Sequence, residues 1–194
     1  MTLALRKIMS RQEFFDWAEA QDARYEFDGF QPVAMTGGTV GHSFLAGSII
    51  RQLGNRLAGS GCRPLGPDAG VATVGGTVRY PDAVVTCTKF NPRDRLVSNP
   101  LVVFEVISPA SGRIDRITKL REYGAVPTIR CYVIVESDAA AVTVLSRDGA
   151  DEPFRAAGLT EGDTLPLPEI GIEIPVAAIY EGIAFEETGK APEL

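Results

Sequence analysis

The sequence predicts an α+β fold in which helices flank a central mixed sheet. Three segments repeat apolar residues at helical spacing, and short apolar runs typical of strands lie between and after them. Single helices separated by groups of strands indicate an α+β domain. At 194 residues, 45% of them hydrophobic and 23% charged, the chain is long enough to bury one sizeable core. We therefore expect residues 1–194 to form a single domain.

The N-terminal segment predicts a helix followed by a hairpin. A capping box at Ser10-Arg11-Gln12-Glu13 marks the start of the helix, which we expect to continue to about Gln21. Strands over residues 25–27 and 32–35 flank the Asp28-Gly29 dipeptide, which is typical of a tight hairpin turn.

A second helix and a group of strands follow the hairpin. Apolar residues at helical spacing predict a helix over residues 40–58. Three short strands are then predicted over residues 62–65, 69–74 and 81–87. The segment 88–100 is polar and rich in helix and strand breakers, which predicts a loop.

The second half of the chain predicts the centre of the sheet. Residues 101–107 form a nearly continuous apolar run, as expected of a central strand covered on both faces. A helix is predicted over residues 113–124, with Ser111 as its cap. Two further strands are predicted over residues 130–135 and 141–146, the second antiparallel to the first.

The C-terminal region predicts shorter elements. We expect a strand over residues 152–156, a turn at Glu161-Gly162-Asp163 and a short helix near residues 176–180. Residues 184–194 are expected to be a frayed tail.

The charge balance restricts how the protein could bind nucleic acid. The chain has 19 basic and 25 acidic residues and a net charge of −6. Proteins that coat nucleic acid by bulk electrostatics are strongly basic, so this charge argues against that class. It does not exclude a nuclease, because catalytic carboxylates add negative charge and a local basic patch can coexist with an acidic total.

Cysteine usage and hydropathy indicate a cytoplasmic protein. Cys62, Cys87 and Cys131 have no C-x-x-C spacing, and we interpret all three as small buried hydrophobic residues in a reducing compartment. No segment has the length of a membrane-spanning helix, and residues 1–11 lack the apolar run of a signal peptide. We therefore expect a cytoplasmic location and no membrane partner.

Two acidic residues stand in apolar strand segments. Asp82 follows Pro81 at the start of one strand, and Glu105 lies inside the next. A buried, unpaired carboxylate is costly, and two carboxylates on neighbouring strands could share a divalent cation. Asp82 could instead be a turn residue, and Glu105 a strand-edge residue that faces water. The segment around Glu105 has no polar alternation, so the pair favours a metal site.

Asp115 and Lys119 lie four residues apart and therefore on one face of the predicted helix. Two interpretations stay open for them. They could form an ordinary surface ion pair of small energetic weight. Alternatively, Lys119 could project over the end of the Glu105 strand, where its ammonium would orient water or stabilise a charged transition state.

Other candidate residues give weaker signals. His42, the single histidine, could be a polar residue near a helix start or an auxiliary base. Arg79 and Arg113 could contact phosphate. The pairs Gly37-Gly38 and Gly75-Gly76 match no phosphate-binding loop and are interpreted as hairpin turns. No Gly-x-Ser-x-Gly elbow or Cys-His pairing indicates a nucleophilic hydrolase.

Several short motifs occur in a characteristic order along the chain: Tyr25-Glu26-Phe27-Asp28-Gly29, His42, Pro81-Asp82, Val103-Phe104-Glu105-Val106-Ile107-Ser108-Pro109-Ala110-Ser111, Asp115-Arg116-x-x-Lys119 and Tyr123-x-x-x-Pro127. Over about residues 13–183 the chain resembles the bacterial Uma family of "putative restriction endonucleases", part of the PD-(D/E)XK nuclease superfamily. The resemblance implies a restriction-endonuclease-like core with extra N- and C-terminal strands.

The resemblance also implies roles for individual residues. Asp82 and Glu105 would ligate Mg²⁺ or Mn²⁺, and Glu26 would supply a third carboxylate to the same metal. Ile107 stands where the superfamily has its lysine, and an aliphatic side chain can neither orient water nor carry charge. Lys119 is the candidate replacement.

These implications predict a divalent-metal-dependent DNA endonuclease. Its catalytic residues would be Asp82, Glu105 and Lys119, and its auxiliary residues Glu26, His42 and Asp115. DNA is the expected partner, and a homodimer is expected because cutting both strands of a duplex needs two active sites. One alternative is a catalytically inactive relative that binds DNA or another protein through the same fold. A second is a structural or regulatory module in which the buried acids only pair with nearby cations.

Overall fold

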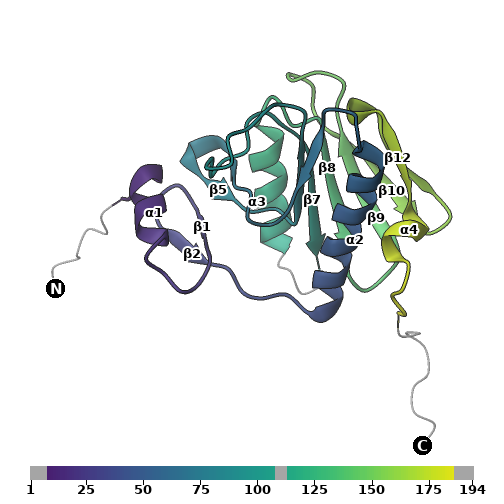
Figure 1. The fold of residues 1–194 in the computed structure, drawn as a ribbon, viewed down its shortest axis with the longest axis horizontal. Helices are drawn as coiled ribbons and strands as arrows, with labels where there is room; N and C mark the ends of the chain where they lie inside the picture. The colour runs from purple at the N-terminus through teal and green to yellow at the C-terminus, as the bar shows by residue number, and fades with distance from the viewer. Residues whose placement is uncertain (1–7, 108–112, 186–194) are drawn as a thin grey trace, which may run out of the picture.

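The computed structural model describes residues 8–107 and 113–185 (Figure 1). Its largest sheet has six strands in the order β10-β9-β8-β7-β6-β3. These strands are β3 (Arg63–Leu65), β6 (Ala83–Thr86), β7 (Pro100–Ile107), β8 (Cys131–Glu136), β9 (Ala141–Ser146) and β10 (Arg155–Thr160). Within this sheet β7 and β8 run parallel, and the other neighbours are antiparallel. The sheet is therefore mixed, which confirms the predicted α+β class.

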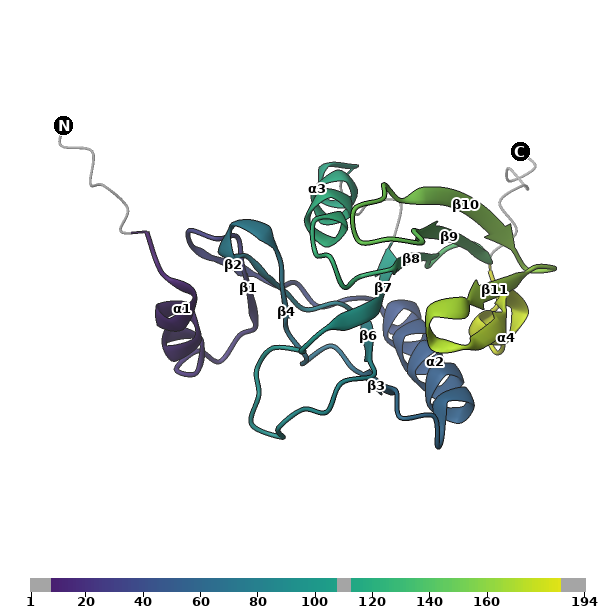
Figure 2. The same ribbon diagram turned by 90° about the horizontal axis from the view of Figure 1, so that it is seen from above.

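Helices and a hairpin cover the two faces of this sheet (Figures 1 and 2). One face packs against α2 (Val40–Leu57), the hairpin of β11 (Thr164–Leu167) and β12 (Ile172–Pro175), and α4 (Val176–Tyr180). The other face packs against α3 (Arg113–Gly124), which joins β7 to β8.

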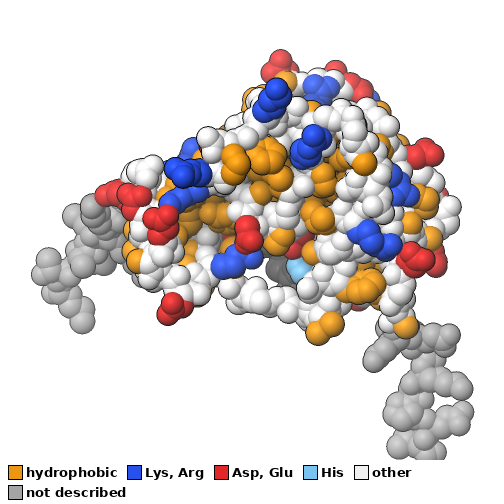
Figure 3. Space-filling view, in the orientation of Figure 1, with side chains coloured by type: hydrophobic (Ala, Val, Ile, Leu, Met, Phe, Trp, Pro, Cys, Tyr) orange, Lys and Arg blue, Asp and Glu red, His pale blue; other side chains and the backbone are white. Residues whose placement is uncertain are grey.

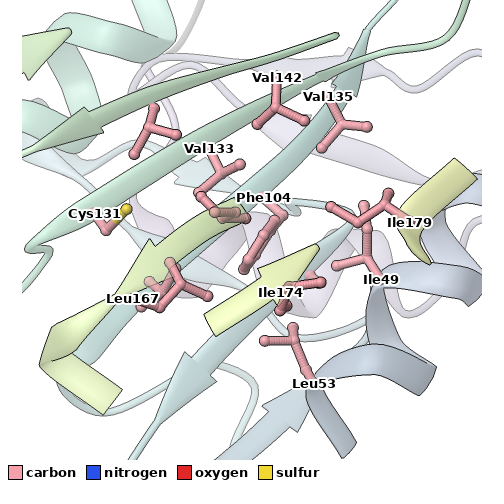
Figure 4. Close-up of a cluster of buried hydrophobic side chains, with 14 of the residues drawn as sticks. Ile49, Leu53, Phe104, Cys131, Val133, Val135, Val142, Leu167, Ile174 and Ile179 are labelled. Carbon is pink, nitrogen blue, oxygen red and sulfur yellow. The ribbon is translucent and has the colours of Figure 1, made fainter. Parts of the chain in front are cut away.

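Alternation along β7 divides its side chains between the two faces. Val102, Phe104 and Val106 point into the core under α2, part of which is shown in Figure 4. Val103 and Ile107 point into the core under α3. Because side chains alternate along a strand, Glu105 shares the α3 face with Val103 and Ile107. The face on which Glu105 lies therefore determines that α3 supplies the partners of Glu105.

A second, four-stranded sheet has the order β2-β1-β5-β4. It combines the N-terminal hairpin with a hairpin from the middle of the chain: β1 (Tyr25–Phe27), β2 (Pro32–Ala34), β4 (Val71–Ala72) and β5 (Val78–Arg79). Helix α1 (Arg11–Ala18) packs beside it through Phe14 and Phe15. The predicted capping box is present, since the Ser10 hydroxyl accepts from the Glu13 N–H and Glu13 accepts from the Ser10 N–H.

The predicted helices are confirmed, and most differences concern short strands. β10 begins three residues later than predicted, and β5, β11 and β12 were not predicted. Each of these three has at most four residues and contains or lies within two residues of glycine or proline, so it shows no clear period. Gly75-Gly76 lies between antiparallel β4 and β5, as predicted. The prediction for Gly37-Gly38 was wrong, because they connect β2 to α2.

The interpretation of the cysteines was wrong for two of the three. Cys62 and Cys87 form a disulfide, and Cys87 is exposed. The antiparallel register pairs Arg63 with Thr86, so Cys62, just before Arg63, lies opposite Cys87, just after Thr86. Only Cys131 is the small buried residue that was expected.

Two predictions fall outside the described residues: the Ser111 cap, and the tail beyond residue 185. None of the helices in residues 8–107 and 113–185 has the length and apolar character needed to cross a membrane.

Candidate active site

A cleft of about 480 Å³ opens at the C-terminal end of β7, between the β2–α2 connection and α3. Figure 3 shows the hollow, with the pale-blue histidine at its edge. The described residues that line it include most of the predicted site: Glu26, His42, Asp82, Glu105 and Lys119. The fold therefore gathers residues that are distributed over the first two thirds of the chain.

The two predicted metal ligands lie side by side. β6 and β7 pair with Ala83 opposite Phe104, so Asp82 and Glu105 are the next opposed pair. Directly opposed residues on antiparallel strands project to the same face of the sheet. The Asp82 Oδ2 accepts a hydrogen bond of 2.7 Å from the Val106 N–H, which fixes this carboxylate against the Glu105 strand.

His42 is the second partner of Asp82. Its Nε2 lies 2.8 Å from the Asp82 Oδ1. The Thr39 hydroxyl caps α2 by accepting from the His42 N–H, which places the imidazole in the first turn of the helix. The hydrogen bond with Asp82 raises the pKa of His42, whereas partial burial lowers it. The charges of Asp82 and Glu105 raise this pKa further, and that of Lys119 lowers it.

Glu105 is buried, with 4% of its surface exposed, and both of its oxygens have partners from α3. The Tyr123 hydroxyl donates to Oε1 at 2.7 Å, and the Lys119 Nζ lies 3.1 Å from Oε2. Burial raises the pKa of Glu105 to about 7, because the charged form loses its hydration. The Asp82 charge also raises it, while the Lys119 ammonium and the Tyr123 hydroxyl lower it.

Glu26 lines the same cleft, but its carboxylate has a strong cationic partner. The Arg79 Nη1 lies 2.7 Å from the Glu26 Oε2. Arg79 also forms a two-pronged ion pair with Glu122 of α3, at 2.6 and 2.8 Å. Its guanidinium is buried between these two acids. The sequence offered Arg79 as a phosphate contact. In the structure, Arg79 joins β5 of the four-stranded sheet to α3.

Sequence reasoning missed two partners on α3, Tyr123 and Glu122. A signal for Tyr123 was present, because it follows Lys119 by four residues and so shares its helical face. Asp115 lies in α3 one turn before Lys119, and Arg113 begins that helix. The side chains of both lie outside what the structure describes.

The donor set fits a hard divalent cation that keeps some of its own water. Within residues 8–107 and 113–185, no three His, Cys, Asp or Glu side chains come together as possible metal ligands. Among the described lining residues, Asp82 and Glu105 offer adjacent carboxylates, while Glu26 is paired with Arg79. Mg²⁺ is commonly held by one or two protein carboxylates, with waters and substrate phosphate completing its shell. Two carboxylates are therefore sufficient for an open site.

The fold is shared with a solved structure. A crystal structure described as a "putative nuclease" from Anabaena variabilis matches it with a TM-score of 0.69, at 12% identity, over 89% of this chain and 97% of that one. This likeness confirms the predicted fold.

The family follows from two sequence comparisons. Residues 11–177 match the Uma2 family, described as "Putative restriction endonuclease". The uncharacterized protein slr1290 of Synechocystis sp. is 31% identical over 183 residues, which cover 91% of this chain and 94% of that protein. The chain therefore belongs to the Uma2 family, and the resemblance seen in its motifs is confirmed.

Proposed function

We propose that this protein is a divalent-metal-dependent endonuclease that hydrolyses phosphodiester bonds in DNA. The observation that carries the proposal is the pair formed by Asp82 and Glu105, two neighbouring carboxylates in one cleft with Lys119 beside them. Membership of the Uma2 family and the nuclease-like fold support the same activity.

Asp82 and Glu105 would hold the metal through their carboxylate oxygens. When bound, Mg²⁺ or Mn²⁺ would supply a water of lowered pKa and polarise the phosphoryl group. The Val106 N–H would keep Asp82 directed at the site, and the Tyr123 hydroxyl would do the same for Glu105. Fixed ligands of this kind reduce the reorganisation that the reaction requires.

Lys119 would act in place of the motif lysine. Ile107 is 5% exposed and packs in the core under α3, so its side chain serves that core. The Lys119 ammonium, 3.1 Å from Glu105, is the cation nearest to this acid among the described ion pairs. From there it would orient the attacking water and stabilise the negative charge that develops on the phosphate.

His42 would act as an auxiliary residue through Asp82. The His42 imidazole is hydrogen-bonded to one oxygen of this carboxylate. The raised pKa of His42 favours the charged imidazolium, which would be the counter-ion of Asp82 while no metal is bound. Once released by His42, that Asp82 oxygen would be available to hold the metal.

Metal-dependent cleavage of supercoiled plasmid tests the proposal. Wild-type protein should nick negatively supercoiled plasmid, whose strands locally unpair, in Mn²⁺ or Mg²⁺, and Asp82→Asn, Glu105→Gln and Lys119→Met should lose at least about a hundredfold in rate. Mn²⁺ should also raise the melting temperature of the wild type and leave that of Asp82→Asn unchanged. Equal nicking by wild type and Glu105→Gln would reveal a contaminating nuclease and refute the assignment.

The inactive relative is the second candidate, and one observation favours it. Glu26 is paired with Arg79, so the third carboxylate that the resemblance implies is engaged elsewhere. A protein that binds Mn²⁺ at Asp82 but cleaves no DNA would support this candidate.

A further inference from the structure

We infer that the cleft accepts a single unpaired DNA strand and excludes an intact duplex. This inference rests on the proposed nuclease function and specifies the substrate of the same site. It depends on the segment that closes one side of the cleft, residues 35–39, which we call the strap. The strap connects β2 to α2, and all five of its residues line the cleft.

Both ends of the strap are anchored. At one end, the Met35 N–H donates to the Arg24 carbonyl at 2.9 Å. At the other, Thr39 caps α2 through the His42 N–H. The strap crosses the space between the four-stranded sheet and the start of α2 (Figures 1 and 2). It is therefore a continuous piece of chain that a substrate must pass to reach the acids.

The reactive groups lie deep behind this strap. The side chains of Asp82 and Lys119 are each 13% exposed, and that of Glu105 is 6% exposed. A scissile phosphate must come within direct reach of these side chains, or of a metal that they hold. On a duplex the phosphates lie on the outside of a wide cylinder, whose major groove alone is roughly 12 Å across.

The size of the cleft suits a short piece of one strand. Its volume of about 480 Å³ is that of a small-molecule pocket. Enzymes that react with a base inside such a pocket act on single strands or extrude the nucleotide from the duplex. A flexible single strand can bend past the strap and bring one phosphate to the acids, whereas a paired strand keeps its partner strand against the rim.

The charges around the cleft agree with a short contact. Among its described lining residues Lys119 is the one lysine or arginine, and it is paired with Glu105, as His42 is with Asp82. The neighbouring Arg79 is bound by two carboxylates. Proteins that bind duplex DNA through its backbone make many phosphate contacts, on the order of 6–10. This cleft offers enough cationic contact for one or two phosphates.

The experiment compares one end-labelled sequence in three forms: single-stranded, as a blunt duplex, and as a duplex with a central unpaired bubble. With full-length protein and Mn²⁺, we expect the single strand to be cut at least about tenfold faster than the duplex. Cuts in the third substrate should fall inside the bubble. Equal rates on single strand and duplex, or cuts in the paired arms, would overturn the inference while the nuclease function stands.

A longer strap tests whether the strap is the cause. Inserting Gly-Ser-Gly-Ser between Thr36 and Gly37 should bring the ratio of single-strand to duplex cleavage close to one. The same insertion after Gly162, in the exposed turn between β10 and β11, is the control and should leave the ratio unchanged. An unchanged ratio in a strap variant that melts cooperatively would overturn the inference. The bubble substrate still decides the matter with wild-type protein if that variant does not fold.

Binding separates failure of this inference from failure of the proposed function. If no substrate is cut, the nuclease proposal fails, and fluorescence anisotropy in Ca²⁺ measures the selectivity of the cleft directly. Tighter binding of the single strand than of the duplex supports the inference. Equal or tighter binding of the duplex, no binding of either, or binding of single-stranded RNA in preference to DNA overturns it.

Discussion

Replacing Glu105 with glutamine should change how the stability of the metal-free protein depends on pH. Glu105 is buried, and its pKa is raised from 4.5 to about 7. A carboxyl with a raised pKa stabilises the folded state while it is protonated. Its contribution is fully present below the unfolded pKa and is lost as pH rises through the folded pKa. Glutamine has nearly the same shape and does not titrate, so it removes this dependence.

The magnitude follows from the size of the rise. Each pH unit between the folded and unfolded pKa corresponds to about 1.4 kcal/mol, so the full effect is about 3 kcal/mol. Between pH 5 and pH 8 most of it is expressed. The free energy of unfolding of Glu105→Gln, relative to wild type, should therefore increase by about 2 to 3 kcal/mol over this range.

Urea denaturation at pH 5, 6, 7 and 8 in EDTA measures this difference. Groups that titrate alike in both proteins cancel, and the pH at which the difference levels off reports the folded-state pKa of Glu105. Glu161→Gln, at an exposed turn, is the isosteric control and should show no such change. A difference that is flat with pH, or a wild type that gains stability relative to the variant as pH rises, would refute the reasoning.

Three further substitutions give distinct outcomes. Gly38→Ala should lower cleavage at least about tenfold, because a Cβ at Gly38 would lie 2.8 Å from the His42 ring. Gly37→Ala should not lower it, because a Cβ at Gly37 meets nothing within 4 Å. Similar rates for the two variants would contradict this. Tyr123→Phe removes a hydrogen bond that lowers the pKa of Glu105, so the acidic limb of the pH–rate profile should move to higher pH; an unmoved limb would show that Glu105 does not control it. Arg79→Leu leaves two carboxylates without their buried partner and should cost about 3–5 kcal/mol in urea denaturation, and a loss below about 1 kcal/mol would contradict the buried-pair account.

The sequence was most informative where one physical signal dominated. Long helical periods predicted α2 and α3, and the uninterrupted apolar run predicted β7 as a central strand. The same run made Glu105 conspicuous, because a charged residue inside it has no solvated face to occupy. The position of Lys119 over the end of the Glu105 strand was one of two interpretations left open, and its ammonium lies 3.1 Å from Glu105 on the face of β7 that α3 covers.

Contacts between distant segments could not be predicted in this way. Arg79 meets Glu122 and Glu26 at sequence separations of 43 and 53, and no local pattern encodes either pair. The Cys62–Cys87 disulfide depends on the register of β3 against β6, which follows from the packed sheet. Gly37-Gly38 of the strap were interpreted as a hairpin turn because a glycine pair is typical of turns, and their place in the connection from β2 to α2 depends on where α2 begins.

The substrate also bears on the oligomeric state. The expected homodimer followed from duplex cleavage, because cutting both strands requires two active sites. If the cleft admits a single strand, one chain holds all the proposed catalytic residues: Asp82 directly before β6, Glu105 in β7 and Lys119 in α3. Specific activity on single-stranded DNA should then stay constant as the protein is diluted through any dimer dissociation seen by analytical ultracentrifugation. A specific activity that falls in parallel with the dimer fraction would show that a second chain contributes to the site, and would restore the homodimer as the functional unit.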